Sequence, residues 1–366
     1  GYSNNNYTEY GVETSINFPS FLFPFLTSDF KRRIRATTEF GLQYNYQLRP
    51  EFSRTIASAS WSYKWMQKQK IQHRIDLLDI SYLYLPWISP QFQEDYIDKD
   101  KDNYILRYNY ENRLIVRMGY TYNYNSAGGT LVNNTITSNS YSIRAGFESA
   151  GNILYGVSKM INMRKNKDGE YAILGIPYAQ YLKGDFDFAK NIIIDHRNSL
   201  AFHAGIGVAV PYGNAKVVPF EKRYFSGGAN SVRGWSVRNL GPGSFAGDGN
   251  FMNQSGDIKL DASIEYRTRL FWKFRGAAFI DAGNIWTIRE YENQPGGAFE
   301  FDKFYKQIAV AYGLGLRLDL DFFVLRFDGG MKALNPVYEK GKDRYPIIHP
   351  KFSRDFAFHF AVGYPF

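Results

Sequence analysis

Hydrophobic and polar residues alternate with a period of two along several long stretches of the chain. Within 258–270 nearly all even positions are apolar, whereas nearly all odd positions are charged or polar. A similar alternation, with polar or small residues between the apolar ones, recurs in 39–47, 310–320 and 356–366. Successive side chains of a β-strand point to opposite faces, so a period of two indicates a strand with one apolar face. These stretches are therefore predicted to be strands.

Two architectures give this alternation. A water-soluble antiparallel sheet buries its apolar face in a core, whereas a transmembrane barrel turns that face to lipid and its polar face to the lumen. The predicted strands are long enough for a tilted span of a bilayer, and aromatic residues such as Trp61, Trp87 and Trp272 crowd the strand ends. No segment shows helical periodicity. The sequence therefore predicts an all-β chain that forms a transmembrane antiparallel β-barrel.

Extending the pattern along the chain predicts thirteen strands. Their bounds are 7–19, 32–48, 51–66, 71–86, 112–126, 138–150, 172–189, 197–211, 256–270, 274–287, 308–320, 322–333 and 355–366. Short joins such as 66–71 and 270–274 are predicted to be periplasmic turns, and long polar joins such as 212–255 to be extracellular loops. Natural single-chain barrels have an even number of strands. An odd count therefore means either that N-terminal strands are missing from the chain or that strands within 86–190 have been merged.

Composition narrows the class of protein further. The chain has 366 residues, no cysteine, a formal net charge of +9 and a mean hydropathy of −0.39. No stretch reaches the roughly 18 apolar residues of a membrane-spanning helix. The absence of cysteine excludes disulfides and thiolate chemistry. The excess of Lys and Arg comes with no motif that reads nucleic acid, so lumen lining or contact with anionic lipopolysaccharide is the simpler explanation.

The run of residues 225–243, FSGGANSVRGWSVRNLGPG, stands out within the longest loop. Its glycines permit backbone angles closed to other residues and a close approach to a neighbouring surface. A solvated loop needs neither the arginines Arg233 and Arg238 nor the apolar Val232 and Trp235. We therefore expect this loop to fold back and dock inside the barrel.

Several motifs resemble the BamA/TamA superfamily of outer-membrane assembly barrels. They are GGANSVRGW (227–235), LGPG (240–243), GDIKLDASIEYR (256–267), FIDAGNIW (279–286) and YGLGLRLDLDFFVLRFD (312–328), followed by an aromatic end of the chain. Within the superfamily, the segments 48–55 and 211–235 look most like the TamA-like branch of Bacteroidota, sometimes called TamL.

The resemblance implies a barrel of sixteen strands in which the arginine loop joins the eleventh strand to the twelfth. Five predicted strands follow that loop here and eight precede it. The resemblance therefore implies that 1–366 is one outer-membrane barrel domain that lacks the first three strands and the N-terminal POTRA domains.

The loop motif also implies a set of contacts. Glu265 lies on the charged face of its strand. Asp281 lies on the next strand, an even number of residues from Arg275, so the two side chains are expected on the same face. In the family the arginine equivalent to Arg233 contacts such carboxylates, which implies a loop lock formed by Arg233, Glu265 and Asp281. On spacing alone, three separate solvated charges remain an alternative. The other residues of the loop motif are Gly227, Gly228, Val232, Gly234, Trp235, Gly241, Pro242 and Gly243.

The last predicted strand carries a second functional element. Its apolar face ends in Phe360, Val362, Tyr364 and Phe366. In the family this strand is the assembly signal and forms a seam with the first strand, where an exposed edge can pair with an incoming strand. Anchoring at the membrane interface, which any barrel needs, is the alternative explanation of these aromatic residues.

These observations predict a function without catalysis. The five histidines form no metal-spaced cluster and lie beside no candidate nucleophile, so no catalytic residue, metal site or cofactor is expected and an enzyme is not predicted. The resemblance implies a factor for assembly, insertion or translocation of outer-membrane polypeptides that uses no nucleotide. Its expected partners are client polypeptides, the lipid bilayer with lipopolysaccharide, and either a TamB-like periplasmic protein or assembly lipoproteins, but no nucleic acid. A passive outer-membrane pore or transporter is the alternative.

Overall fold

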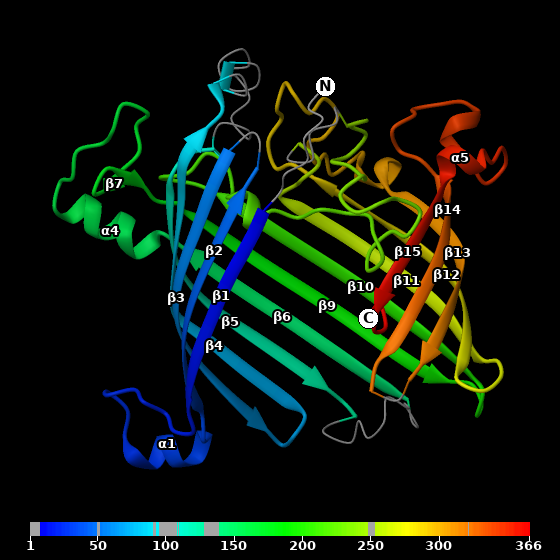
Figure 1. Cartoon of the computed structure of the whole chain (residues 1–366), viewed down its shortest axis with the longest axis horizontal. Helices are drawn as coiled ribbons and strands as arrows, with labels where there is room; N and C mark the ends of the chain where they lie inside the picture. The colour runs from blue at the N-terminus through cyan, green and yellow to red at the C-terminus, as the bar shows by residue number, and fades with distance from the viewer. Residues whose placement is uncertain are drawn as a thin grey trace. The chain divides into compact units, whose positions relative to one another are not determined.

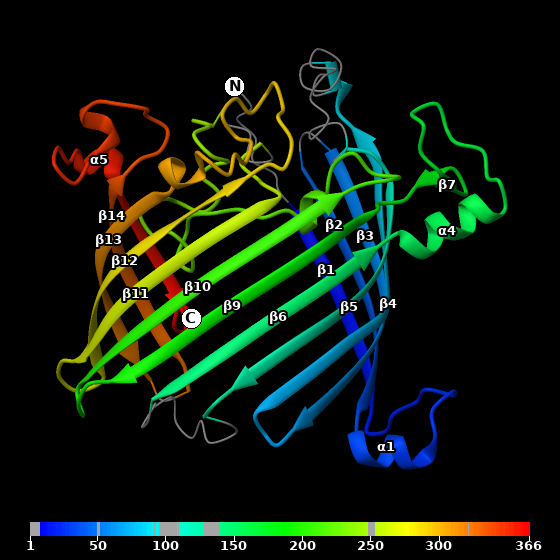
Figure 2. The same cartoon turned by 180° about the vertical axis from the view of Figure 1, so that it is seen from behind.

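Thirteen antiparallel strands form one sheet in the computed structural model of the chain (Figures 1 and 2). The structure describes residues 8–49, 52–90, 93–94, 108, 110–127, 139–247, 253–320 and 322–366. The order of the strands is β1-β2-β3-β4-β5-β6-β9-β10-β11-β12-β13-β14-β15, which is their order in the sequence. Strands β1 and β15 are the edges, so the described strands form an open sheet rather than a closed barrel.

The strand bounds agree closely with the period-two pattern. They are β1 Thr8–Phe18, β2 Thr37–Leu48, β3 Phe52–Gln67, β4 Ile71–Ile88, β5 Arg113–Asn125, β6 Ser140–Ala150, β9 Tyr181–Ile193, β10 Asn198–Pro211, β11 Ile258–Arg269, β12 Phe274–Trp286, β13 Ala309–Asp319, β14 Val324–Leu334 and β15 Phe356–Val362. The predicted number of strands in the sheet is confirmed, and the alternative of merged strands within 86–190 is not needed. Eight strands precede the arginine loop and five follow it.

A few short helices lie between the strands of this all-β fold, although no segment of the sequence is predicted to be helical. Three α-helices are present in the described residues, α1 (Ser28–Ile34), α4 (Asn152–Met160) and α5 (Phe352–Asp355). Helix α1 occupies the start of the segment predicted as a strand from 32, and β2 begins only at Thr37. The predicted strand 172–189 is also displaced, because a separate two-stranded sheet of β7 (Ala172–Ile173) and β8 (Ile176–Pro177) precedes β9.

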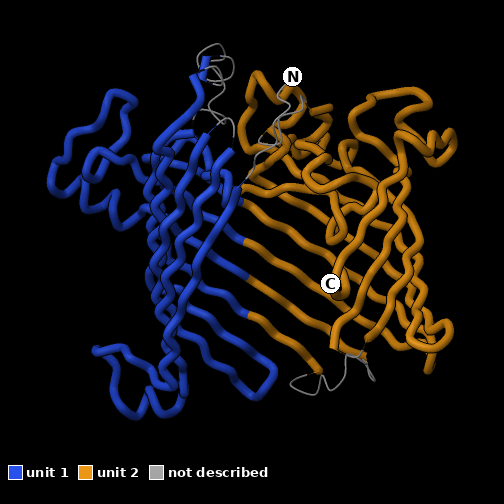
Figure 3. Tube along the Cα trace, in the orientation of Figure 1, with its two compact units in different colours: residues 1–122, 146–184, 209–222 blue, residues 123–145, 185–208, 223–366 orange. Residues whose placement is uncertain are grey.

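The chain divides into two compact units, coloured blue and orange in Figure 3. The first comprises 1–122, 146–184 and 209–222, and the second comprises 123–145, 185–208 and 223–366. Helices α1 and α4 belong to the first unit. The docked part of the arginine loop and strands β11 to β15 belong to the second unit, so the whole candidate site lies within one unit.

In the second unit, charged side chains of the sheet are buried and apolar ones are exposed, which is the reverse of a water-soluble sheet. On β11 the apolar Ile264 is 46% exposed, whereas its charged neighbour Glu265 is 0% exposed. On β13 and β15, Leu314 and Phe358 are likewise exposed while Arg317 is buried. We call the buried polar face the inner face and the exposed apolar face the outer face. A sheet that buries its charges and exposes continuous apolar rows fits a lipid-facing barrel wall and not a soluble sandwich.

Among the residues that the structure describes, no helix combines the length and apolar character needed to cross a membrane.

Candidate functional site

Part of the long loop between β10 and β11 packs on the inner face of the second unit. Val232, Trp235 and Leu240 of the loop form a buried cluster with Ala309 and Ala311 of β13. Removing such apolar side chains from water stabilises the docked position by about 1.5–3 kcal/mol for each large residue. The apolar residues of the motif therefore anchor the loop on the wall of the sheet.

Two glycines of the loop stand where no side chain fits. Gly227 has φ +91°, and a Cβ there would lie 2.3 Å from the carbonyl oxygen of Ser236. Gly234 packs against β13 and β14, where an added Cβ would lie 2.8 Å from the Cβ of Ala311 and 3.3 Å from the backbone nitrogen of Lys332. The glycines thus let the loop close on itself and approach the strands at backbone distance.

The LGPG segment is tied to the end of β12. The backbone N–H of Gly243 donates to the carbonyl oxygen of Ile285 at 2.7 Å, and the Asn284 side-chain amide donates to the carbonyl oxygen of Gly243 at 2.8 Å. These bonds fix the second half of the docked segment at the loop end of the sheet.

Arg233 is the centre of the site. Its side chain is 1% exposed, and its Nε and Nη2 donate to the two carboxylate oxygens of Asp281, each at 2.8 Å. The backbone N–H of Arg233 donates to the same carboxylate at 3.1 Å, and Nη1 donates to Glu265 at 2.6 Å. The guanidinium carbon lies 3.5 Å from the ring centre of Phe279. The structure therefore brings Arg233, Glu265 and Asp281 together with a bidentate, charge-assisted geometry.

A second layer of charge surrounds this contact. Arg317 of β13 donates to Asp328 at 2.6 Å and to Glu265 at 2.9 Å. Asp328 also lies 3.4 Å from Nη1 of Arg233, and Arg326 lies 3.5 Å from Asp328. Arg267 also donates to Glu265 at 2.7 Å, so four arginines, Arg233, Arg267, Arg317 and Arg326, face three carboxylates, Glu265, Asp281 and Asp328. Buried charges require such pairing, because one left alone is strongly destabilising.

Strand β15 takes part in the same network. The Nε2 atom of His359 lies 2.9 Å from the carbonyl oxygen of Arg233, and because a carbonyl only accepts, this ring nitrogen carries the proton. Asn230 of the loop accepts a hydrogen bond from Arg326. Sequence reasoning did not select His359, Arg317, Arg326 or Asp328 as residues of the site. The available signal was their position on the polar face of β13, β14 and β15, which does not say which of them the loop covers.

The end of the chain departs from the predicted strand. Strand β15 stops at Val362, and Gly363 has φ +89°, so the prediction of a strand to 366 is wrong. Phe360 and Val362 lie exposed on the outer face as predicted. Tyr364 does not continue that row, because the guanidinium carbon of Arg267, on the inner face of β11, lies 4.6 Å from its ring centre. Phe366 stacks on the inner-face His203 with ring centres 5.3 Å apart. The left-handed backbone at Gly363 reverses the direction of the last side chains.

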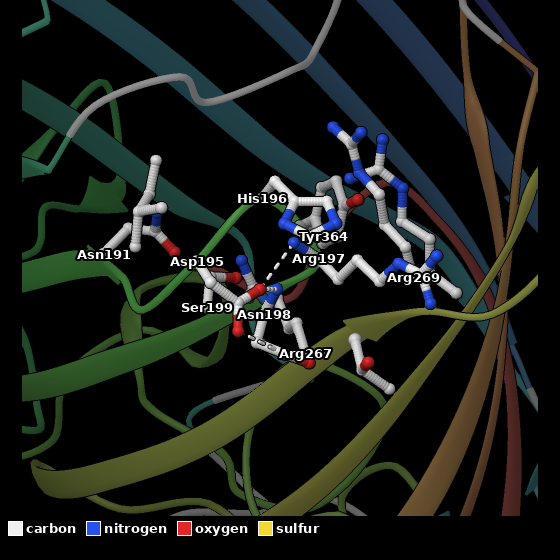
Figure 4. Close-up of a pocket in the computed structure, with 12 residues that line it drawn as sticks. Asn191, Asp195, His196, Arg197, Asn198, Ser199, Arg267, Arg269 and Tyr364 are labelled. Atoms are coloured by element: carbon white, nitrogen blue, oxygen red, sulfur yellow. Dashed lines mark hydrogen bonds between the residues drawn. The ribbon is translucent and has the colours of Figure 1, made fainter.

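Figure 4 shows a small cavity at the turn end of β10 and β11. It has a volume of about 70 Å³, and Arg197, Arg267, Arg269 and Tyr364 are among the residues that line it. Four arginines, Arg197, Arg267, Arg269 and Arg275, share this lining with neutral polar residues and Asp195. In the part of the chain that the structure describes, no three His, Asp or Glu side chains are grouped so as to hold a metal ion.

Asp281→Asn tests the charge of the loop contact without changing its shape. We expect it to weaken docking by about 1.5–3 kcal/mol, the range for hydrogen bonds to charged groups, because Arg233 loses its bidentate anionic partner. Hydrogen–deuterium exchange of 226–243 measures the effect. Asp319→Asn is the control, since Asp319 pairs with Arg275 away from the loop. Unchanged exchange in Asp281→Asn would show that the carboxylate charge does not hold the loop.

The outer apolar rows, the buried inner charges and the docked loop define a transmembrane β-barrel of the kind found in the bacterial outer membrane. The family model for the Omp85 superfamily domain matches residues 1–366. The chain therefore belongs to the Omp85 superfamily and is an integral protein of the bacterial outer membrane. This membership confirms the superfamily, the fold class and the location predicted from the sequence.

The chain is also similar to individual proteins and solved structures. The chain is 30% identical over 102 residues to the outer membrane protein assembly factor BamA of Neisseria meningitidis serogroup B, a match that covers 25% of this chain and 12% of that protein. The crystal structure of BamA from Haemophilus ducreyi lacking POTRA domains 1–3 superposes with a TM-score of 0.59 at 16% identity, covering 97% of this chain and 62% of that chain. CdiB from Escherichia coli gives a TM-score of 0.47 at 10% identity, over 89% of this chain and 50% of that one. The chain thus spans less than two thirds of the length of each relative.

Proposed function

We propose that this chain is the barrel of a factor that assembles or translocates outer-membrane polypeptides, and that β15 templates an incoming strand by edge pairing. No nucleotide takes part. The driving force is the formation of main-chain hydrogen bonds by a strand that would otherwise enter lipid with its N–H and C=O groups unpaired.

The observation that supports this proposal is the position of β15 as an edge strand of the sheet that the described residues form. The strand pairs with β14 from Leu325↔Val362 to Met331↔Phe356 and is the last strand in the sheet order. An edge strand presents a row of N–H and C=O groups to a partner strand. Strand β15 is short and ends at the turn at Gly363. A client strand can therefore pair with it and leave again, because few inter-strand hydrogen bonds must be broken.

A passive pore is the competing function, and the docked loop disfavours it. Arg233 and the cluster around Trp235 hold 226–243 against the inner face, where a permanent channel would need open space. A pore predicts steady conductance from the intact protein and no contact between β15 and a client.

Photo-crosslinking tests the templating proposal. In the full-length protein, a photoreactive amino acid replaces Phe360 on the edge strand or, as a matched control, its register partner Phe327 on β14. Both side chains are exposed on the outer face. We expect an unfolded outer-membrane client to crosslink from 360 and not from 327 during insertion into vesicles. Equal crosslinking from both positions, or none from 360 while the client still folds, would contradict templating by β15.

The partners follow from the same proposal. We propose client outer-membrane polypeptides as substrates, and a TamB-like periplasmic protein or assembly lipoproteins as accessory subunits. The segments 48–55 and 211–235 support a TamA-like role of the Bacteroidota type, and they favour the TamB-like partner. Capture of accessory subunits by the full-length protein distinguishes the two arrangements.

A further inference from the structure

Helix α4 presents an apolar face that the protein leaves uncovered. Ile153, Val157, Met160 and Ile161 are 64%, 44%, 77% and 56% exposed. Their spacing of four, three and one places them on one side of a helix. A small helix that exposes four large apolar side chains on one side indicates a binding surface rather than scattered surface residues.

The opposite side of α4 is fixed to the protein. Ser158 is buried and lies 3.1 Å from the hydroxyl of Tyr178. The helix begins after Gly151, whose φ is +71° and where a Cβ would lie 2.1 Å from the carbonyl oxygen of Ala179. The helix is therefore held with its apolar side outward and cannot rotate to bury it without breaking these contacts.

The helix lies at the loop end of the sheet. It starts two residues after the end of β6, at the end of the sheet opposite the short turns, and Figures 1 and 2 both show it extending sideways from the strand ends. Phe147 of β6 and Leu182 of β9, on the neighbouring outer face, are exposed and apolar. Exposed apolar side chains are thus present both on α4 and on the neighbouring ends of β6 and β9.

The chain around α4 is strongly basic. Lys159 lies in the last turn of the helix, and Arg164, Lys165 and Lys167 follow it. The segment 159–170 thus carries four cations and two acidic residues, Asp168 and Glu170. Glu170 pairs with Arg113 at 3.5 Å. An apolar face bordered by cations matches an anionic lipid surface, in which acyl chains lie beneath charged headgroups.

We propose that α4 is an interfacial helix that lies in the headgroup region of the leaflet at the loop end of the barrel. Its apolar side enters the acyl boundary, and Lys159, Arg164, Lys165 and Lys167 contact anionic headgroups. The helix anchors this part of the wall at a fixed depth. This inference rests on the membrane location of the barrel and not on the proposed assembly activity.

Fluorescent labelling tests the depth of the helix. The chain has no cysteine, so Val157→Cys gives a single attachment point for an environment-sensitive fluorophore, and Asp168→Cys in the exposed turn after the helix is the matched control. In vesicles of phosphatidylcholine and phosphatidylglycerol, we expect the probe at 157 to be quenched by spin-labelled lipid and shielded several-fold from aqueous iodide. The probe at 168 should show the reverse. Equal iodide access at both positions would overturn the proposal, as would shielding at 157 without lipid quenching, which indicates a protein partner or a second copy.

The basic residues are tested separately. Replacing Arg164, Lys165 and Lys167 with glutamine should reduce lipid quenching at 157 in vesicles that contain phosphatidylglycerol and leave it unchanged in phosphatidylcholine alone. The heat-dependent mobility of the folded barrel on gels confirms that the variant is folded. A loss of quenching that is the same in both lipids would contradict the assignment of these residues to anionic headgroups.

Discussion

Replacing Arg233 with alanine is expected to release the loop from the inner face. The substitution leaves Glu265 and Asp281 as buried carboxylates without their central cation, and breaking one partner of a buried pair costs about 3–5 kcal/mol. Arg267 and Arg317 still pair with Glu265, so the loss falls mainly on Asp281, which is 1% exposed. Hydrogen–deuterium exchange across 226–243 should rise, and conductance through the reconstituted barrel should be retained or increase.

Two further variants separate this effect from a general loss of stability. Arg238→Ala removes the other arginine of the motif, which stacks on Phe225 outside the buried network, and it should leave exchange of the loop unchanged. Arg233→Lys should be intermediate, because one ammonium cannot span both carboxylates as the guanidinium does. If Arg233→Ala retains wild-type exchange and conductance, the ion pairs do not hold the loop. If assembly is normal and only solute uptake changes, the proposed function fails and the pore is favoured.

The strands could be predicted from the sequence because a barrel wall enforces its pattern at every position. One face meets lipid and the other the polar interior, so the period-two signal survives along the full length of β11 and β13. The segments between the strands do not separate lipid from the polar interior, so their sequences need not alternate. Helices α1 and α4 are short and lie in these segments. Ile153, Val157, Met160 and Ile161 have helical spacing, but a pattern of two turns is too short to distinguish the helix from the surrounding loop.

The centre of the site could be predicted only in part. The alternation of side chains along the strands indicates that Glu265 and Asp281 point inward, and the loop motif indicates that Arg233 reaches them. This alternation gives the face on which a charge lies but not whether the docked loop covers it. Arg317 and Asp328 can therefore be identified only from the positions of the strands in the structure. The reversal after Val362 depends on the backbone of Gly363, since glycine adopts extended and left-handed angles with similar ease.

Gly330→Ala tests the docking of the loop without altering any charge. A Cβ at Gly330 on β14 would lie 2.1 Å from the carbonyl oxygen of Arg233 and 2.7 Å from its carbonyl carbon. The methyl group can fit only if the loop backbone lifts, which also stretches the hydrogen bond from His359 to that oxygen. We expect overpacking to destabilise the docked loop by about 1–3 kcal/mol, measured as faster exchange of 226–243.

The neighbouring glycine supplies the control. Gly329 lies on the other face of the same strand, where a Cβ would meet the ring of Phe356 at 3.1 Å, a contact that a side-chain movement relieves. Gly329→Ala should therefore leave the loop docked. In the double variant of Arg233→Ala and Gly330→Ala, the measured total should be smaller than the sum of the two losses, because Gly330 lies against the backbone of Arg233 and residues in contact are coupled. Full additivity would mean that the ion pairs and the close backbone approach stabilise the docked loop independently of each other.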